Sequence, residues 1–207
     1  MVEQQVRPWE VIDQRVLDLI GRAPREDYVP AAYRNLAFAD LNLPIGHGQV
    51  MMAPKYEARI LQELEINPDD RILEIGTGTG FFTSLLAALG ASVTSVEIVP
   101  ELKAGAETAL AAHDVRNVTL ELGDGARGWN QGGPYDVIVL TGSTPVLPDT
   151  FVRNLTPKGR LFAVVGHAPV MEARALRRLD GGTETRSLFE TDLPALANAF
   201  DTPTFTL

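Results

Sequence analysis

Three glycine-rich or acidic segments of this chain could together bind a nucleoside-like ligand. The first, Glu74-Ile75-Gly76-Thr77-Gly78-Thr79-Gly80, follows an apolar run. Its glycines let the backbone turn tightly and approach a ligand closely, and the helix expected after it would present free amides to the same ligand. Taken alone, the segment is also compatible with a simple tight turn between a strand and a helix.

Two carboxylates farther along the chain also lie where expected strands end. Glu97 ends the alternating run 92–96, where it could accept hydrogen bonds from both hydroxyls of a ribose. Asp124 lies between two glycines and could accept a hydrogen bond from the amino group of adenine, although an aspartate there is also typical of a turn. Each signal is weak alone. The three follow three consecutive expected strands, and together they predict a site for an adenosyl ligand.

A regular alternation of strands and helices would position these groups. Apolar runs predict strands over 71–75, 91–97, 118–122, 136–141 and 161–165, and helices are expected over 81–89 and 100–113. Such alternation requires crossover connections, and therefore predicts a mostly parallel sheet with helices on both faces. In open sheets of this kind, ligands bind at the carboxyl ends of the strands. The predicted fold class is α/β and Rossmann-like.

The two ends of the chain extend this core. Val16, Leu17 and Ile20 have helical spacing and predict a helix that ends near Pro24, and a second helix is expected to begin at Pro54. Residues 25–54 look irregular, and two runs around 180–182 predict a hairpin at one edge of the sheet. We expect a single domain over 1–207, with a helical and loop region over the site (1–68) and a cofactor-binding core (69–207).

Bulk composition excludes several classes of function. The chain has 207 residues and a net charge of −9, which argues against a nucleic-acid partner, because such binding depends on clustered Lys and Arg. There is no apolar run of about 18 residues and no signal peptide, so we expect no membrane span and a cytoplasmic location. The chain has no cysteine, and its three histidines lack the spacing of a metal site.

The spacing of the glycines separates two kinds of nucleotide site. A dinucleotide fingerprint, G-x-G-x-x-G, would need a glycine at position 81, which is Phe81. The pattern E-x-G-x-G-x-G instead resembles motif I of the class I S-adenosylmethionine methyltransferases. That ligand has no pyrophosphate, so a different loop shape is physically reasonable.

Within that group, the chain resembles the protein-L-isoaspartate O-methyltransferases. The matching segments are 25–30, 37–40, 43–49 with Pro54, 73–80, 123–129, and 136–141 followed by Pro145 and Pro148. The Pro-Ile-Gly-x-Gly-Gln segment at 44–49 is specific to that family. Its members transfer methyl from S-adenosylmethionine to the free carboxylate of an L-isoaspartyl residue. The ester then closes to a succinimide, whose hydrolysis returns some normal aspartate.

The resemblance implies a cofactor set and an acceptor loop. The loop 45–49 would lie over the site, and Gln49 and positions 50 and 52 would be the catalytic positions. The cofactor-binding residues would be Glu74, Gly76, Thr77, Gly78, Gly80, Glu97, Ile98, Asp124, Gly125 and Thr141. The implied partner is a peptide or protein with an isoaspartyl residue, and no metal is implied.

The acceptor loop departs from the family. Members read Gly-Gln-Thr-Ile-Ser-x-Pro, whereas Val50 stands here for the threonine and Met52 for the serine. Phe38 likewise replaces a usual tyrosine, so we expect three hydroxyls to be missing from one neighbourhood. A carboxylate acceptor is ionised at pH 7 and needs no general base, so the loss removes an orienting hydrogen bond. Met51 and Met52 could face the cofactor or pack in the core.

Three hypotheses follow. The first is a methyltransferase that repairs isoaspartyl residues. The second retains the cofactor but methylates a small molecule or another protein group, and the apolar loop modestly favours it. The third is a binding or regulatory protein that keeps the cofactor pocket without catalysis.

Overall fold

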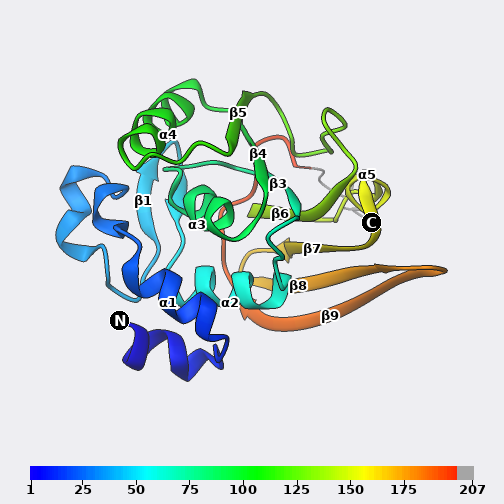
Figure 1. Ribbon diagram of the computed structural model, residues 1–207, viewed down its shortest axis with the longest axis horizontal. Coiled ribbons are helices and arrows are strands. Elements are labelled where there is room, and N and C mark those ends of the chain that lie inside the picture. The colour runs from blue at the N-terminus through cyan, green and yellow to red at the C-terminus, as the bar shows by residue number, and fades with distance from the viewer. Residues whose placement is uncertain (200–207) are drawn as a thin grey trace, which may run out of the picture.

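The structure, a computed structural model, describes residues 1–199 and has a central sheet with helices on both faces (Figure 1). The seven-stranded sheet has the order β5-β4-β3-β6-β7-β8-β9. Its strands are β3 (Arg71–Ile75), β4 (Ser92–Glu97), β5 (Val118–Leu122), β6 (Tyr135–Thr144), β7 (Leu155–His167), β8 (Val170–Leu179) and β9 (Gly182–Thr191). Strands β3 to β7 pair in parallel, and β8 and β9 form an antiparallel hairpin at one edge. The predicted fold class and edge hairpin are confirmed.

The predicted helices are also present. They are α1 (Gln14–Arg22), α2 (Pro54–Leu64), α3 (Phe81–Leu89) and α4 (Pro100–Ala112). A further short helix, α5 (Asp149–Arg153), was not predicted. The Asp13 side chain caps α1 by accepting from the backbone N–H of Arg15. Both α2 and α4 begin with proline, which is preorganised for the first helical turn.

The two faces of the sheet belong to separate apolar clusters. Ile72 packs with side chains of α1, α2 and α3 on one face. Leu73 and Ile75 pack with Phe151 of α5 on the other. Successive side chains of a strand point to opposite faces, so a strand covered on both sides reads as a continuous apolar run. This double burial is why central strands such as β3 could be predicted from the sequence.

The strand order creates a crevice beside β3. From β3 the chain proceeds outward through β4 to β5 and then crosses to β6, on the other side of β3. The connections that leave the carboxyl ends of β3 and β6 therefore run in opposite directions. Such a topological switch point is where open α/β sheets bind ligands.

The segment 25–54, expected to be irregular, contains a small second sheet. Two antiparallel strands, β1 (Leu43–Gly46) and β2 (Gln49–Met51), form a hairpin. At its turn, Gly46, His47 and Gly48 all have positive φ angles of 92°, 53° and 72°. Strands of four and three residues are too short for a periodic pattern, so the sequence did not predict them.

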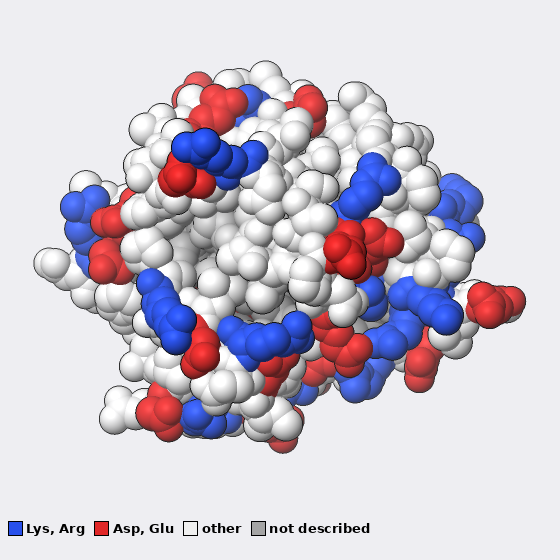
Figure 2. Space-filling model, viewed as in Figure 1, with Lys and Arg blue, Asp and Glu red and all other residues white. Residues whose placement is uncertain are grey.

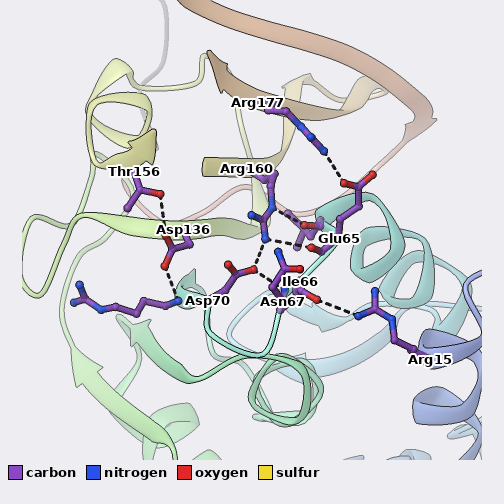
Figure 3. Close-up of polar contacts among 11 residues, drawn as sticks. Arg15, Glu65, Ile66, Asn67, Asp70, Asp136, Thr156, Arg160 and Arg177 are labelled. Atoms are coloured by element: carbon purple, nitrogen blue, oxygen red, sulfur yellow. Dashed lines mark hydrogen bonds and ion pairs between the residues drawn. The ribbon is translucent and has the colours of Figure 1, made fainter. Parts of the chain in front are cut away.

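A polar network braces the end of the sheet opposite this hairpin (Figure 3). Arg160 of β7 donates to the carbonyl oxygens of Leu64, at 2.8 Å, and Glu65, at 3.2 Å, and pairs with the carboxylate of Asp70. The connection between α2 and β3 is thereby fixed to the sheet.

Charged side chains of both signs lie close together on the face shown in Figure 2. Glu63 of α2 pairs with Arg186, and Glu65, the residue after α2, pairs with Arg177, so this helix and its end are joined to the edge hairpin. None of the helices in residues 1–199 is long and apolar enough to cross a membrane.

Candidate cofactor and acceptor site

A cavity opens at the switch point, between the carboxyl ends of the strands and the β1–β2 hairpin. Most of the residues named from the sequence line it. These are Gln49, Val50, Met52, Gly76, Thr77, Gly78, Glu97, Ile98, Asp124, Gly125 and Thr141. Residues from five separate stretches of the chain are therefore brought to one site.

The loop after β3 forms part of the cavity wall, and two of its glycines are required by geometry. Gly76 has φ of +100°, and a Cβ atom there would collide with the hydroxyl of Thr141. That hydroxyl lies 2.9 Å from the carbonyl oxygen of Ile75, which ties the loop to β6. Gly78 has φ of +56°, and its Cβ would lie 3.2 Å from Ile45 of the hairpin. Side chains here would strain the backbone and close the space between loop and hairpin.

Glu97 is held as a fixed acceptor at the end of β4. Its Oε2 accepts from the backbone N–H of Gly78 at 2.9 Å, and its Oε1 accepts from that of Val99 at 3.0 Å. Each carboxylate oxygen retains a further lone pair. A pair of vicinal hydroxyls, such as those of a ribose, is a suitable donor for such an acceptor.

Asp124 lies in the same cavity, after β5. Its Oδ1 accepts from the backbone N–H of Ala126 at 3.1 Å, and its Oδ2 accepts from the side chain of Asn198 at 3.0 Å. The apolar side chains of Ile75, Val96 and Ile98 also line the cavity. A flat ring with an exocyclic amino group suits this combination of an acceptor and apolar walls.

Two residues of the expected cofactor set, Glu74 and Gly80, are not among those that line the cavity. Glu74 is fully buried and accepts hydrogen bonds from Thr83 and Ser95, each at 2.6 Å. Desolvation by burial raises the pKa of Glu74 to about 8, so the group is protonated at neutral pH. The Ser95 hydroxyl lies 2.6 Å from that of Thr77, so Glu74 supports the loop from behind.

Gly80 has a packing role. It has φ of +82°, and a Cβ atom there would lie 3.1 Å from the side chain of Ala106 in α4. The close approach of α3 and α4 therefore depends on this glycine.

The acceptor loop presents apolar groups to the cavity. Met51 and Met52 are both 5% exposed and belong to the core, and both also line the cavity. Val50 is half-buried and lines the cavity as well. The expectation for Phe38 was wrong, because this side chain is 45% exposed and does not line the cavity. Phe38 lies in the turn before β1, outside the wall that β2 supplies.

Part of the cavity was not predicted from the sequence. Leu196 and Ala197 line it from the segment after β9, and Glu57 lines it from α2. The backbone N–H of Leu196 donates to the carbonyl oxygen of Ser143 at 2.9 Å, and Gln49 donates to that of Ala195 at 3.3 Å. The segment has neither helical nor strand periodicity, so no sequence signal marked it.

Comparison with known proteins identifies the family to which this chain belongs. The sequence model of the family described as protein-L-isoaspartate(D-aspartate) O-methyltransferase matches residues 1–192. A protein-L-isoaspartate O-methyltransferase of Gloeobacter violaceus is 39% identical over 190 residues, which are 91% of this chain and 93% of that protein. Another, from an Anaeromyxobacter species, is 42% identical over 182 residues, or 87% of this chain and 84% of that protein.

Solved structures share the fold. A protein-L-isoaspartate O-methyltransferase superposes with a TM-score of 0.79 at 23% identity, covering 94% of this chain and 65% of that one. A β-aspartate methyltransferase structure from Plasmodium falciparum, in complex with S-adenosyl-L-homocysteine, has a TM-score of 0.77 at 18% identity and covers 94% and 96% of the two chains. On the family match and the close relatives together, this chain belongs to the protein-L-isoaspartate(D-aspartate) O-methyltransferase family.

Proposed function

We propose that this protein transfers the methyl group of S-adenosylmethionine to the free carboxylate of an L-isoaspartyl residue in a damaged peptide or protein. Family membership supports the reaction, and S-adenosylmethionine is the methyl donor of the family. The observation that carries the proposal is one cavity that joins the fixed carboxylates of Glu97 and Asp124 to the family's acceptor loop. We further propose that residues 1–68 cover the acceptor side of a core formed by 69–207.

The residues present fit this cofactor. Glu97 would accept from the ribose hydroxyls, Asp124 would accept from the adenine amino group, and Ile98 would contact the ring. The loop from Gly76 to Gly78, which lacks Cβ atoms where Thr141 and Ile45 approach, would leave room for the methionyl part. When bound, S-adenosylmethionine supplies a methyl group on a positively charged sulfur that a carboxylate oxygen can displace directly.

The protein's own contribution is alignment and the exclusion of water. An isoaspartyl carboxylate is ionised at pH 7, so no side chain needs to remove a proton from it. Val50, Met51 and Met52 form an apolar wall that keeps water away. The side-chain amide of Gln49, the preceding residue, lines the same cavity. Holding the two reactants close in a dry site can account for much of a rate enhancement.

A second candidate function keeps the cofactor and changes the acceptor to a small molecule or another protein group. The observation that favours it is the same apolar wall, because Val50 and Met52 offer no hydroxyl to orient a carboxylate. Burying an ionised acceptor against apolar groups is also costly. Nucleic acid remains an unfavourable partner for a chain with a net charge of −9.

Two measurements test these proposals. Calorimetry should detect micromolar binding of S-adenosylhomocysteine, weakened strongly by Glu97→Ala. Incubation with labelled cofactor should then methylate an isoaspartyl peptide but not its aspartyl isomer. Binding without transfer to that peptide would reject the repair activity. Transfer to some other acceptor in a cell extract, abolished by Gly78→Arg, would then separate the second candidate from a protein that only binds the cofactor.

A further inference from the structure

Arg25 is a buried cation outside the cavity whose side chain joins several parts of the site. Its side chain is 2% exposed, and arginine is almost never so fully buried unless it has partners. The Nε atom donates to the carbonyl oxygen of Ala37 at 2.7 Å. One terminal nitrogen pairs with the carboxylate of Glu57, and the other donates to the carbonyl oxygen of Met52.

Two of the partners of Arg25 line the cavity. Met52 ends the acceptor loop, and Glu57 lines the cavity from α2. The guanidinium also lies 5.0 Å from the ring centroid of Phe81, the first residue of α3 after the glycine loop. One rigid, planar group therefore fixes the acceptor wall relative to the element that carries the cofactor loop.

The contribution of the Arg25–Glu57 ion pair to stability does not explain why an arginine is buried here. Burial raises the pKa of Glu57, and the positive charge of Arg25 opposes that shift. A buried pair of this kind often contributes no more to stability than apolar side chains of similar volume would. What apolar groups cannot replace is the directed hydrogen bond to the Met52 carbonyl, because that bond sets the course of the backbone where the loop meets the cavity.

We propose that Arg25 is a positioning residue for methyl transfer, which fixes the Met52 carbonyl and thereby the acceptor wall that Val50 and Met52 form. This inference rests on the proposed transfer to an isoaspartyl carboxylate. Arg25 does not line the cavity, so it acts on the reaction only through the lining residues that it holds, Met52 and Glu57.

The chain offers a matched control in Arg160. This arginine also donates to two backbone carbonyls, those of Leu64 and Glu65, and also pairs with one carboxylate, that of Asp70 (Figure 3). Its side chain is 13% exposed, and none of these partners lines the cavity. The two arginines therefore have the same local chemistry, but only Arg25 is connected to the site.

The test compares Arg25→Lys with Arg160→Lys in the full chain. Lysine keeps the charge but cannot present its donors in the fixed, planar directions that the two carbonyls and the carboxylate require. Both variants should lose thermal stability. Only Arg25→Lys should lower kcat for an isoaspartyl peptide, by roughly 10- to 100-fold, the usual effect of a small misplacement of reactants. Its affinity for S-adenosylhomocysteine should stay close to that of wild type.

Hydrogen exchange of peptides that cover 43–54 gives a second readout, independent of activity. Exchange there should rise in Arg25→Lys and not in Arg160→Lys. If wild type fails to methylate the peptide, the proposed function is rejected and the exchange data alone decide this inference. Wild-type exchange and kcat in Arg25→Lys, or equal losses of kcat in both variants, would overturn it.

A double variant covers the case in which Arg25→Lys does not fold. Arg25→Met with Glu57→Met removes both charges together, which buried sites often tolerate, and also removes the bond to the Met52 carbonyl. It should fold and show the same rise in exchange over 43–54. Unchanged exchange in that folded variant would contradict the positioning role.

Discussion

The side-chain amide of Asn198 donates a hydrogen bond to Oδ2 of Asp124 at 3.0 Å, and so joins the segment after β9 to the loop after β5. The other oxygen, Oδ1, accepts from the backbone N–H of Ala126. Both carboxylate oxygens therefore have a donor before any ligand binds, and the group is already oriented toward the cavity. Such orientation reduces the entropy that a ligand must lose on binding.

We therefore expect graded effects on cofactor affinity at these two positions. Asp124→Ala removes an acceptor from the site and should weaken S-adenosylhomocysteine binding on the order of 10-fold or more, the usual value of a hydrogen bond to a charged group. Asn198→Ala leaves the carboxylate but orients it less, so its effect should be smaller. Calorimetry measures both, with the exposed Asp114→Ala as control. A larger loss for Asn198→Ala than for Asp124→Ala would contradict this assignment.

A pair of glycine substitutions tests the loop after β3. Gly76→Ala adds a Cβ at φ of +100°, where it would meet the Thr141 hydroxyl, so both stability and cofactor binding should fall. Gly105→Ala adds the same methyl group in α4, where nothing lies within 4 Å. That change should raise stability by about 0.5–1 kcal/mol, because alanine is the better helix former. Thermal melts and calorimetry on both variants decide the matter.

The sequence predicted the central strands of the sheet because these are covered on both faces. Ile72 and Leu73 enter opposite apolar clusters, so apolar residues follow one another in their strand, and Gly80 and Pro100 mark where helices begin. By contrast, the β1–β2 hairpin is too short for periodicity, and its existence depends on three successive residues with positive φ. No alternating pattern therefore marks that hairpin in the sequence.

The site residues that lie at the end of a strand could be predicted from the sequence. Glu97 ends β4 and Asp124 lies two residues after the end of β5, so parallel pairing alone brings them to one edge. Leu196 and Arg25 could not be assigned in that way. Leu196 enters the cavity through backbone hydrogen bonds to Ser143, and Arg25 finds Glu57 through packing of remote segments, neither of which leaves a local pattern.

Restoring hydroxyls at positions 50 and 52 should show whether each position serves methyl transfer or core packing. Val50 is half-buried and lines the cavity, so Val50→Thr should change stability little. It should raise methylation of an isoaspartyl peptide on the order of 10-fold by restoring an orienting hydrogen bond. Met52 is 5% exposed and belongs to the core, so Met52→Ser should cost roughly 2–5 kcal/mol of stability. Turnover and melting temperature are measured on each single variant and on the double variant.

The outcome of that comparison bears on the choice of acceptor. A gain in turnover from Val50→Thr would support a carboxylate that lies beside position 50. If Val50→Thr folds like wild type and its turnover does not change, the family's role for this position does not apply to this chain, and the changed acceptor becomes the better hypothesis.

The buried carboxyl of Glu74 should make stability depend on pH. Its pKa is raised from 4.5 to about 8 in the folded protein, chiefly by burial, so unfolding between these pH values releases a proton. The free energy of unfolding should therefore fall as pH rises through this window, by up to a few kcal/mol. Glu74→Gln, which stays neutral, should show a shallower decline.

Urea denaturation from pH 5 to 9 measures both proteins. The raised pKa of Glu57 acts in the same direction in each, so the difference between them isolates Glu74. Parallel pH profiles for the two proteins would show that Glu74 ionises without penalty in the folded state.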